Sequence, residues 1–405
     1  MYLEEAEKSN YKWYILLLAT VTYGLTVGAE RMCLPPLFPE IVADLNMSMT
    51  QMGTIWGMDP LAGVFVGLIS GLFIDRFGIK WTLSIVCVLA GITGAARGLS
   101  TGFSSMMVTM FMFGLLVAMM PTLIPKVAAV WFSGKNLALA NGVLSLGMTG
   151  GSVIGTMLSA TVLSPLLGGW SHVLFLYGGP PILLGILWWA TGKEPAHFDS
   201  GTKKTGKVPF RESLPHVLRI KEIWWLGFIF MGAYGAFMGI GGYLPTYLRN
   251  IGWTPNLADS ALTVIVGASA VSSIPMALLS DKLGSRKKIL VPALLLAVIS
   301  LALMPLFDGT AIWGLVLING LVRGAMFPLI IAIQVELKGV GARYAGTAVG
   351  LTSSLGMLGA FAAQPLGLNL IDAYGASAPL YFWAGLSFFT MIGFFFIKEQ
   401  PKKND

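Results

Sequence analysis

Twelve apolar stretches, each about 20 residues long, dominate the sequence. An α-helix needs roughly 20 apolar residues to cross about 30 Å of hydrocarbon. Hydrophobic residues make up 55% of the chain and charged ones 11%, so too few polar side chains remain to cover a water-soluble surface. The sequence therefore predicts an all-α membrane protein with twelve transmembrane helices. We place these helices at residues 12–34, 50–73, 80–98, 103–125, 138–163, 171–191, 223–247, 260–280, 289–307, 311–334, 345–369 and 376–397.

One short polar segment between apolar stretches occurs twice. Residues 71–80 read GLFIDRFGIK, and residues 277–286, about 206 positions later, read ALLSDKLGSR. A repeat at this distance indicates that the two halves of the chain are the same structural unit. We predict an N-terminal six-helix bundle at residues 1–191, a cytoplasmic linker at 192–222 and a C-terminal six-helix bundle at 223–405.

The net charge of +7 does not indicate a nucleic-acid partner, because the basic residues are placed as in a membrane protein. With the N-terminus inside, every Lys and Arg except Arg31, Arg97, Arg249 and Arg323 falls on cytoplasmic loops or helix ends. This bias predicts a cell (inner) membrane protein with both termini in the cytoplasm. Arg97 is expected to extend to the outer interface. The basic linker is expected to attract anionic membrane lipid.

Three charged residues fall inside the N-terminal apolar stretches. Glu30 and Arg31 lie at outer-leaflet depth in the first, and Asp59 precedes a proline in the second. An ionised group at this depth costs a few kcal/mol unless it faces a partner or a watery cavity. Tyr23 is seven residues before Glu30 and is expected on the same helix face. Two alternatives stay open: the first helix ends early and the pair is solvated, or Asp59 only neutralises Arg31.

The C-terminal half has one deep basic residue, Arg323, with Asn319 one turn earlier on the same face. An arginine without an acidic neighbour on its own helix implies a partner across a cleft or an anionic ligand. The hydroxyls of Tyr234 and Tyr243 could contact a polar solute, although Tyr243 also fits an interfacial tyrosine belt. Gln364 adds a polar side chain to the eleventh stretch.

Small residues gather in the fifth apolar stretch, which contains Gly142, Gly147, Gly150, Gly151 and Gly155. Such a pattern predicts close helix contact. No nucleophile and base, and no metal-ligand constellation, stands out in the sequence, and His172 is the only histidine outside the linker. We therefore expect no enzyme activity, no metal and no cofactor.

Residues 71–80 follow the pattern G-x-x-x-D-R/K-x-G-x-R/K, and residues 277–286 follow it with Ala277 in place of the first glycine. This pattern resembles the loop signature of the major facilitator superfamily. The resemblance implies the major facilitator fold, two pseudo-symmetric six-helix bundles that transport by alternating access. It also implies a gating role for the matching positions, namely Gly71, Asp75, Arg76, Gly78, Lys80, Asp281, Lys282, Gly284 and Arg286.

A narrower resemblance is to the anion:cation symporter family. It rests on the acid–arginine pair of helix one and on four short segments, at residues 44–48, 51–53, 127–132 and 244–248. It implies uptake of organic anions such as sugar acids, or of phosphate, with protons, and substrate contact by Arg31. Glu30 stands where that family has an aspartate. The family's helix-four glutamate is missing from residues 111–118, which moves the predicted proton site to Glu30 or Asp59.

The sequence thus predicts a monomeric secondary active transporter that carries a small organic anion, a carboxylate or sugar acid, together with protons. Two other functions stay open: a proton-coupled exporter of cationic or amphipathic compounds that uses Glu30 and Asp59, and a non-transporting membrane sensor. The predicted substrate-binding residues are Arg31, Arg323, Tyr23, Asn319, Tyr234, Tyr243 and Gln364.

Overall fold

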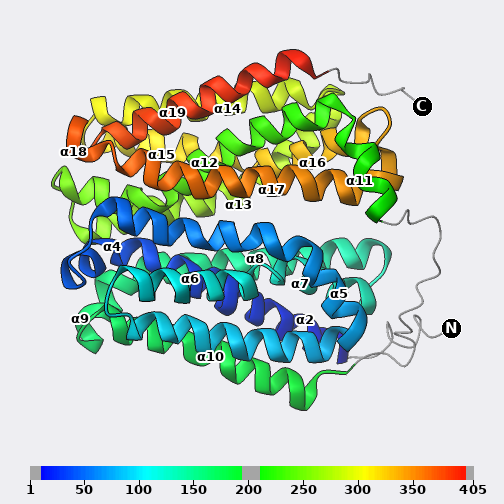
Figure 1. Cartoon of the computed structure of the whole chain (residues 1–405), viewed down its shortest axis with the longest axis horizontal. Coiled ribbons are helices and arrows are strands. Elements are labelled where there is room, and N and C mark those ends of the chain that lie inside the picture. The colour runs from blue at the N-terminus through cyan, green and yellow to red at the C-terminus, as the bar shows by residue number, and fades with distance from the viewer. Residues whose placement is uncertain (1–10, 194–209, 398–405) are drawn as a thin grey trace. The chain divides into compact units, whose positions relative to one another are not determined.

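The computed structural model describes residues 11–193 and 210–397, without the side chains of residues 67–76, 135, 210, 211 and 342. The described chain is built of helices joined by short turns, as predicted (Figure 1). Eleven helices of this described part are long and apolar enough to cross a membrane. The remaining predicted span, at residues 50–73, is the first part of a 48-residue helix, and its last side chains are not described.

The helices of the N-terminal half begin and end as follows: α2 (Tyr11–Thr22), the π-helical η1 (Tyr23–Ala29), α3 (Glu30–Met32), α4 (Leu34–Asp44), α5 (Met49–Ala96), η2 (Arg97–Leu99), α6 (Phe103–Val117), α7 (Met120–Trp131), α8 (Gly134–Leu158), η3 (Ser159–Leu163), α9 (Ser164–Leu167) and α10 (Trp170–Thr191). Those of the C-terminal half are α11 (Phe210–Leu218), α12 (Lys221–Asn250), α13 (Pro255–Leu283), α14 (Lys287–Leu303), η4 (Met304–Leu306), α15 (Thr310–Arg323), α16 (Met326–Glu336), α17 (Gly341–Leu368), α18 (Ile371–Tyr374), α19 (Ala378–Met391) and η5 (Ile392–Phe396).

The chain forms two compact units. One comprises Met1–Lys203 and Thr254–Thr263, and the other comprises Lys204–Trp253 and Val264–Asp405. In the first unit, α5 packs against α6 and α10, and α8 packs against α2 and η1 (Figure 1). In the second, α12 packs against α17 and α19, and α14 packs against α15 and α19. The bundle boundaries at residues 191 and 223 stay predictions.

Both copies of the repeated polar segment end a helix at a glycine. Gly78 has φ 76° and interrupts α5 inside the predicted loop, and Gly284 has φ 65° directly after α13. L-amino acids with a side chain rarely adopt this left-handed conformation, and glycine adopts it freely. The glycine of the motif is therefore explained by the turn that it makes.

The glycines of α8 face η1 and its neighbours at backbone contact distance. A side chain added at Gly147 would lie 2.6 Å from the carbonyl oxygen of Thr20, and one at Gly155 would lie 2.6 Å from that of Ala29. At Gly151 it would run into the carbonyl group of Gly24. In lipid the hydrophobic effect does not drive helices together, so their association depends on van der Waals packing, which small residues allow at short distance. The predicted close contact is thus made by three of the five glycines.

We expect Gly151→Ala to destabilise the protein by about 1–3 kcal/mol, because the added methyl group must push α8 away from η1. Gly150→Ala is the matched control, since a side chain at this neighbouring position meets nothing within 4 Å. Thermal unfolding in detergent measures both variants. Equal melting temperatures for the two would show that the α8 contact does not depend on a missing side chain.

Candidate functional site

The first unit holds an ion pair between Arg31 of α3 and Asp59 of α5, formed by the Arg31 Nε and Asp59 Oδ2 atoms. The Arg31 side chain is 15% exposed and that of Asp59 is 4% exposed. Asp59 is buried where α6 crosses α5, because a side chain at Gly114 would lie 2.8 Å from the Asp59 Cα atom. The pair thus has one buried acidic end and one basic end that is partly exposed.

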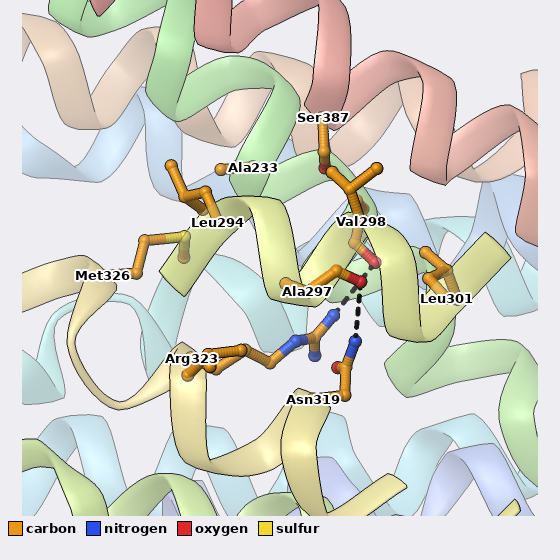
Figure 2. A pocket seen from close by; sticks show the side chains of 11 residues that line it. Ala233, Leu294, Ala297, Val298, Leu301, Asn319, Arg323, Met326 and Ser387 are labelled. Atoms are coloured by element: carbon orange, nitrogen blue, oxygen red, sulfur yellow. Dashed lines mark hydrogen bonds between the residues drawn. The ribbon is translucent and has the colours of Figure 1, made fainter. Parts of the chain in front are cut away.

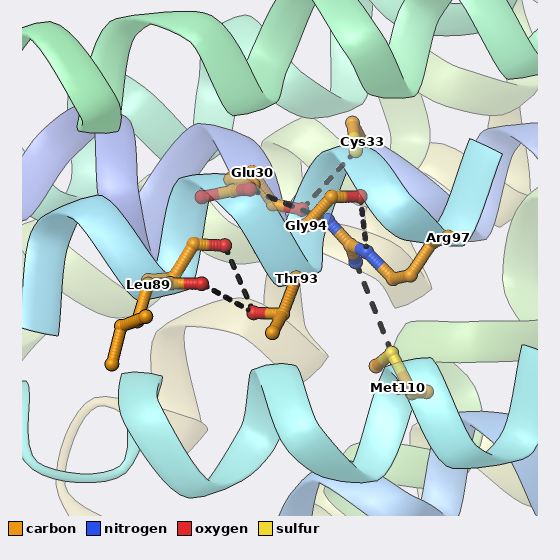
Figure 3. Close-up of polar contacts among 8 residues, drawn as sticks. Glu30, Cys33, Leu89, Thr93, Gly94, Arg97 and Met110 are labelled. Atoms are coloured by element: carbon orange, nitrogen blue, oxygen red, sulfur yellow. Dashed lines mark hydrogen bonds and ion pairs between the residues drawn. The ribbon is translucent and has the colours of Figure 1, made fainter. Parts of the chain in front are cut away.

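Glu30 does not join this pair, although it is the neighbour of Arg31 in sequence. Its side chain is fully buried, and its Oε1 atom lies 3.8 Å from Nη2 of Arg97 (Figure 3). Neither carboxyl oxygen accepts a hydrogen bond from the described residues. The alternative in which the first helix ends early and leaves Glu30 in water is wrong, because the helical path continues to Asp44.

Arg97 is fully buried, so the expectation that it extends to the outer interface is wrong. It donates hydrogen bonds to two carbonyl oxygens, from Nη2 to Glu30 at 3.1 Å and from Nε to Gly94 at 3.0 Å (Figure 3). Its guanidinium carbon lies 3.9 Å from the centre of the Phe113 ring. The buried carboxyl group of Glu30 provides the counter-charge that makes this burial tolerable.

Gly94 makes room for the Glu30 carboxyl group. A side chain at this position would run into Oε1 of Glu30. Sequence reasoning missed Gly94 and the pairing of Arg97 with Glu30. The available signal was the presence of an acid in the first apolar stretch and a base near the end of the third, since charged groups inside the membrane need a partner.

The helix that carries Glu30 and Arg31 contains a π-helical segment, η1, just before them. A π-helix winds more residues into each turn than an α-helix does. The seven-residue spacing therefore no longer returns Tyr23 to the face of Glu30, as the sequence had suggested. Tyr23 is close enough to Arg31 to interact with it electrostatically, whereas Glu30 interacts with Arg97.

The second unit buries Arg323 at the end of α15. Its Nη1 atom donates to the carbonyl oxygen of Phe237 at 3.3 Å and its Nη2 atom to that of Ala236 at 3.4 Å. The guanidinium carbon lies 4.5 Å from the centre of the Phe237 ring. Among the described residues, no carboxyl group forms an ion pair with Arg323. Both hydrogen bonds are longer than the usual range of roughly 2.7–3.2 Å, so they hold the guanidinium weakly.

Asn319 and Arg323 line one small cavity, into which both side chains extend from α15 (Figure 2). Asn319 donates from Nδ2 to the Ser300 hydroxyl at 3.0 Å and to the Ala297 carbonyl oxygen at 3.3 Å. Its Oδ1 atom has no partner among the described residues. The cavity holds about 20 Å³, which is enough for one water molecule and too little for an organic anion.

The other predicted substrate contacts of the second unit are spread along two helices. Tyr234 belongs to an aromatic cluster, stacked on Phe230 and on Phe237, whose ring also lies against Arg323. Tyr243 donates its hydroxyl to the Ala376 carbonyl oxygen at 3.0 Å, away from the Arg323 cavity. Gln364 of α17 is buried, and its Nε2 atom has no partner among the described residues.

The predicted gating positions are only partly described. Gly71, Asp75 and Arg76 lie among the side chains that the structure does not describe. In the second copy, Arg286 bridges Asp281 at 2.7 Å and Glu336 at 3.0 Å, and Lys282 is exposed. Partial burial by itself lowers the pKa of Arg286, but hydrogen bonds and ion pairs with Glu336 and Asp281 outweigh it and raise the pKa. Glu336 is a partner that the motif did not indicate.

No group of three or more His, Cys, Asp or Glu side chains in the described part of the chain could hold a metal ion. Cys33 and Cys87 are both free and buried. The described chemistry is therefore that of paired and unpaired charges inside helices.

Several relatives with named activities resemble this chain. It is 25% identical to a probable nitrate/nitrite antiporter of Thermus thermophilus over 67% of the chain and 62% of that protein. It is 25% identical to a hexuronate transporter of Bacillus subtilis over 62% of the chain and 59% of that protein. Each match spans less than two thirds of the relative. A 3-(3-hydroxy-phenyl)propionate transporter of Escherichia coli is 27% identical over 84% of the chain and 85% of that protein.

Two solved transporter structures share the fold. A bacterial homolog of the human lysosomal transporter Spinster, inward-facing and occupied, matches with a TM-score of 0.76 at 17% identity over 96% of this chain and 97% of its own. A nucleoside transporter matches with a TM-score of 0.76 at 15% identity over 95% of this chain and 100% of its own. The sequence model of the Major Facilitator Superfamily matches residues 16–364 and 233–405. The chain is therefore a multi-pass membrane protein that belongs to the Major Facilitator Superfamily.

Proposed function

We propose that this protein is a secondary active transporter that moves a small organic anion together with protons by alternating access. It works as a monomer in the cell (inner) membrane, with both termini in the cytoplasm. The basic residues on predicted cytoplasmic loops support this orientation.

The Arg31–Asp59 ion pair carries the proposal. Arg31 is partly exposed and Asp59 is buried, so an anion from water reaches the arginine end of the pair. A guanidinium group binds a carboxylate through two parallel hydrogen bonds, which favours a carboxylate substrate. An anion that takes Arg31 leaves Asp59 buried without its cation, where the ionised form is unfavourable and a proton binds. Binding of the anion then promotes binding of the proton.

Glu30 is the second candidate for the coupling proton, and its surroundings favour a structural role. Its partner Arg97 is fully buried and also hydrogen-bonded to two backbone carbonyl groups. A substrate cannot take this arginine without breaking those bonds. The exchange of partners that couples proton and anion is therefore assigned to Asp59.

Arg323 and Asn319 supply a second substrate contact in the proposal. Arg323 lacks an ion-pair partner among the described residues, and its two backbone hydrogen bonds are long. A substrate carboxylate would make shorter, charge-assisted bonds in their place. The guanidinium must leave Ala236 and Phe237 to do so, because the cavity beside it, of about 20 Å³, is too small for an organic anion. Tyr23, near Arg31, and Tyr234, in the Phe237 cluster, are the aromatic side chains placed to join these contacts.

The names of the relatives support an anionic cargo. Nitrate, hexuronate and 3-(3-hydroxy-phenyl)propionate are the compounds in the names of three similar proteins. All three are anions at neutral pH, and the two organic ones carry a carboxylate. Their sizes differ widely, so the shared feature is the negative charge.

We expect Arg31→Gln and Arg323→Gln each to weaken binding of an organic carboxylate about tenfold to hundredfold, the effect of losing a charge-assisted hydrogen bond of about 1.5–3 kcal/mol. Thermal-shift titration with a panel of mono- and dicarboxylates, sugar acids, inorganic anions and organic cations measures this. Arg343→Gln, at an exposed position, is the control. Stabilisation by cations alone, or unchanged anion binding in both variants, would overturn the anion proposal.

We expect Asp59→Asn to abolish accumulation driven by a pH gradient in proteoliposomes while substrate counterflow continues, because the neutral amide cannot release a proton. Wild-type uptake should rise as the outside becomes more acidic than the lumen. Glu30→Gln is measured in parallel and should still accumulate substrate if it folds. If Glu30→Gln loses accumulation and Asp59→Asn keeps it, the coupling proton belongs to Glu30.

A further inference from the structure

An open apolar groove of about 370 Å³ runs along the first unit, between the second part of α5 and α10. Both helices belong to candidate membrane spans, Phe77–Leu99 and Trp170–Thr191. The wall from α5 includes Trp81, Ile85 and Leu89, which are exposed and share one helix face. Ile186 and Trp189 form the opposite wall and are also exposed.

The groove exists because the two helices touch through a glycine. A side chain at Gly185 would lie 2.7 Å from the Ser84 carbonyl oxygen and 2.9 Å from the Val88 nitrogen. Larger side chains on either side of this contact, among them Ile85 and Ile186, form the walls of the groove. The lining hydroxyl of Ser84 is satisfied by the Lys80 carbonyl oxygen at 3.0 Å, so the floor offers no polar group to a ligand. A long apolar chain fits these surroundings.

Two tryptophans line one end of the groove, and two lysines lie close to them in the sequence. Trp81 and Trp189 mark this end, and Lys80 directly precedes Trp81. The Cγ atom of Lys80 lies 3.3 Å from where a side chain of Gly192 would begin, three residues after Trp189. Lys193 follows, with its ammonium 5.0 Å from the centre of the Tyr11 ring. Tryptophans and lysines at the end of a membrane helix lie at the depth of the lipid head groups.

We propose that this groove is a binding site for one anionic phospholipid. An acyl chain lies along the apolar floor between Ile85 and Ile186, and the phosphate lies between the ammonium groups of Lys80 and Lys193. The apolar floor binds the chain of any phospholipid, and the two lysines select an acidic head group. The site lies in the first unit alone and does not depend on the identity of the transported solute.

Native mass spectrometry of the purified full-length protein tests the site, titrated with phosphatidylglycerol or with phosphatidylcholine of the same acyl chains. We expect the first phosphatidylglycerol to bind about 25-fold more tightly than phosphatidylcholine, because each of the two lysines near a membrane surface favours anionic lipid about fivefold. The double variant Lys80→Gln/Lys193→Gln should lose this preference. Lys288→Gln/Lys338→Gln, which removes two exposed lysines of the second unit, should keep it.

A second pair of variants tests the apolar part. Ile186→Trp fills the groove from an exposed position and should lower binding of both lipids. Leu187→Trp, at a neighbouring exposed position that does not line the groove, should leave binding unchanged. Equal affinity of wild type for the two lipids, equal loss in both lysine double variants, or unchanged binding in Ile186→Trp would each overturn the proposal.

Discussion

The need to neutralise charge inside a low-dielectric interior governs the first unit. Glu30, Asp59 and Arg97 are buried and Arg31 is partly exposed, and each lies inside or at the end of a predicted membrane span. Such groups are tolerated only in pairs or with strong hydrogen bonds. The helices that carry them are held at the required distance by glycines, because Gly94 leaves room for the Glu30 carboxyl group and Gly114 lets α6 approach Asp59.

The two pairs differ in what they allow. Arg97 is enclosed by Glu30, Gly94 and Phe113, so its surroundings leave no open side for a solute. Arg31 keeps an exposed side while its partner is buried. The Glu30–Arg97 pair therefore suits a structural role, and the Arg31–Asp59 pair suits a contact in which a substrate replaces one partner. Glu30 and Arg31 are adjacent in sequence, but their different partners suit them to different roles.

The second unit carries its own copy of the loop motif, but no buried ion pair like those of the first unit is formed by its described residues. Arg323 is held by two carbonyl oxygens and an aromatic ring, without an ion-pair partner among the described residues. Its interior polar groups Asn319 and Gln364 each keep an unpartnered atom within the described part of the chain. A repeat thus conserves backbone architecture through helix length and turn glycines, and the side chains inside each unit are free to differ.

The sequence alone determined the helices, the repeat, the turn glycines and the presence of deep charges, because the membrane requires long apolar stretches and leaves little freedom for exceptions. Only the tertiary structure decided the partners. Arg97 was expected at the interface and instead binds Glu30, because helix packing brings η2 to α3. Tyr23 does not share a helix face with Glu30, because the π-helical segment between them has more residues per turn than an α-helix. The position of a charged residue within an apolar stretch indicates its depth in the membrane. It does not indicate which residue of another helix pairs with that charge.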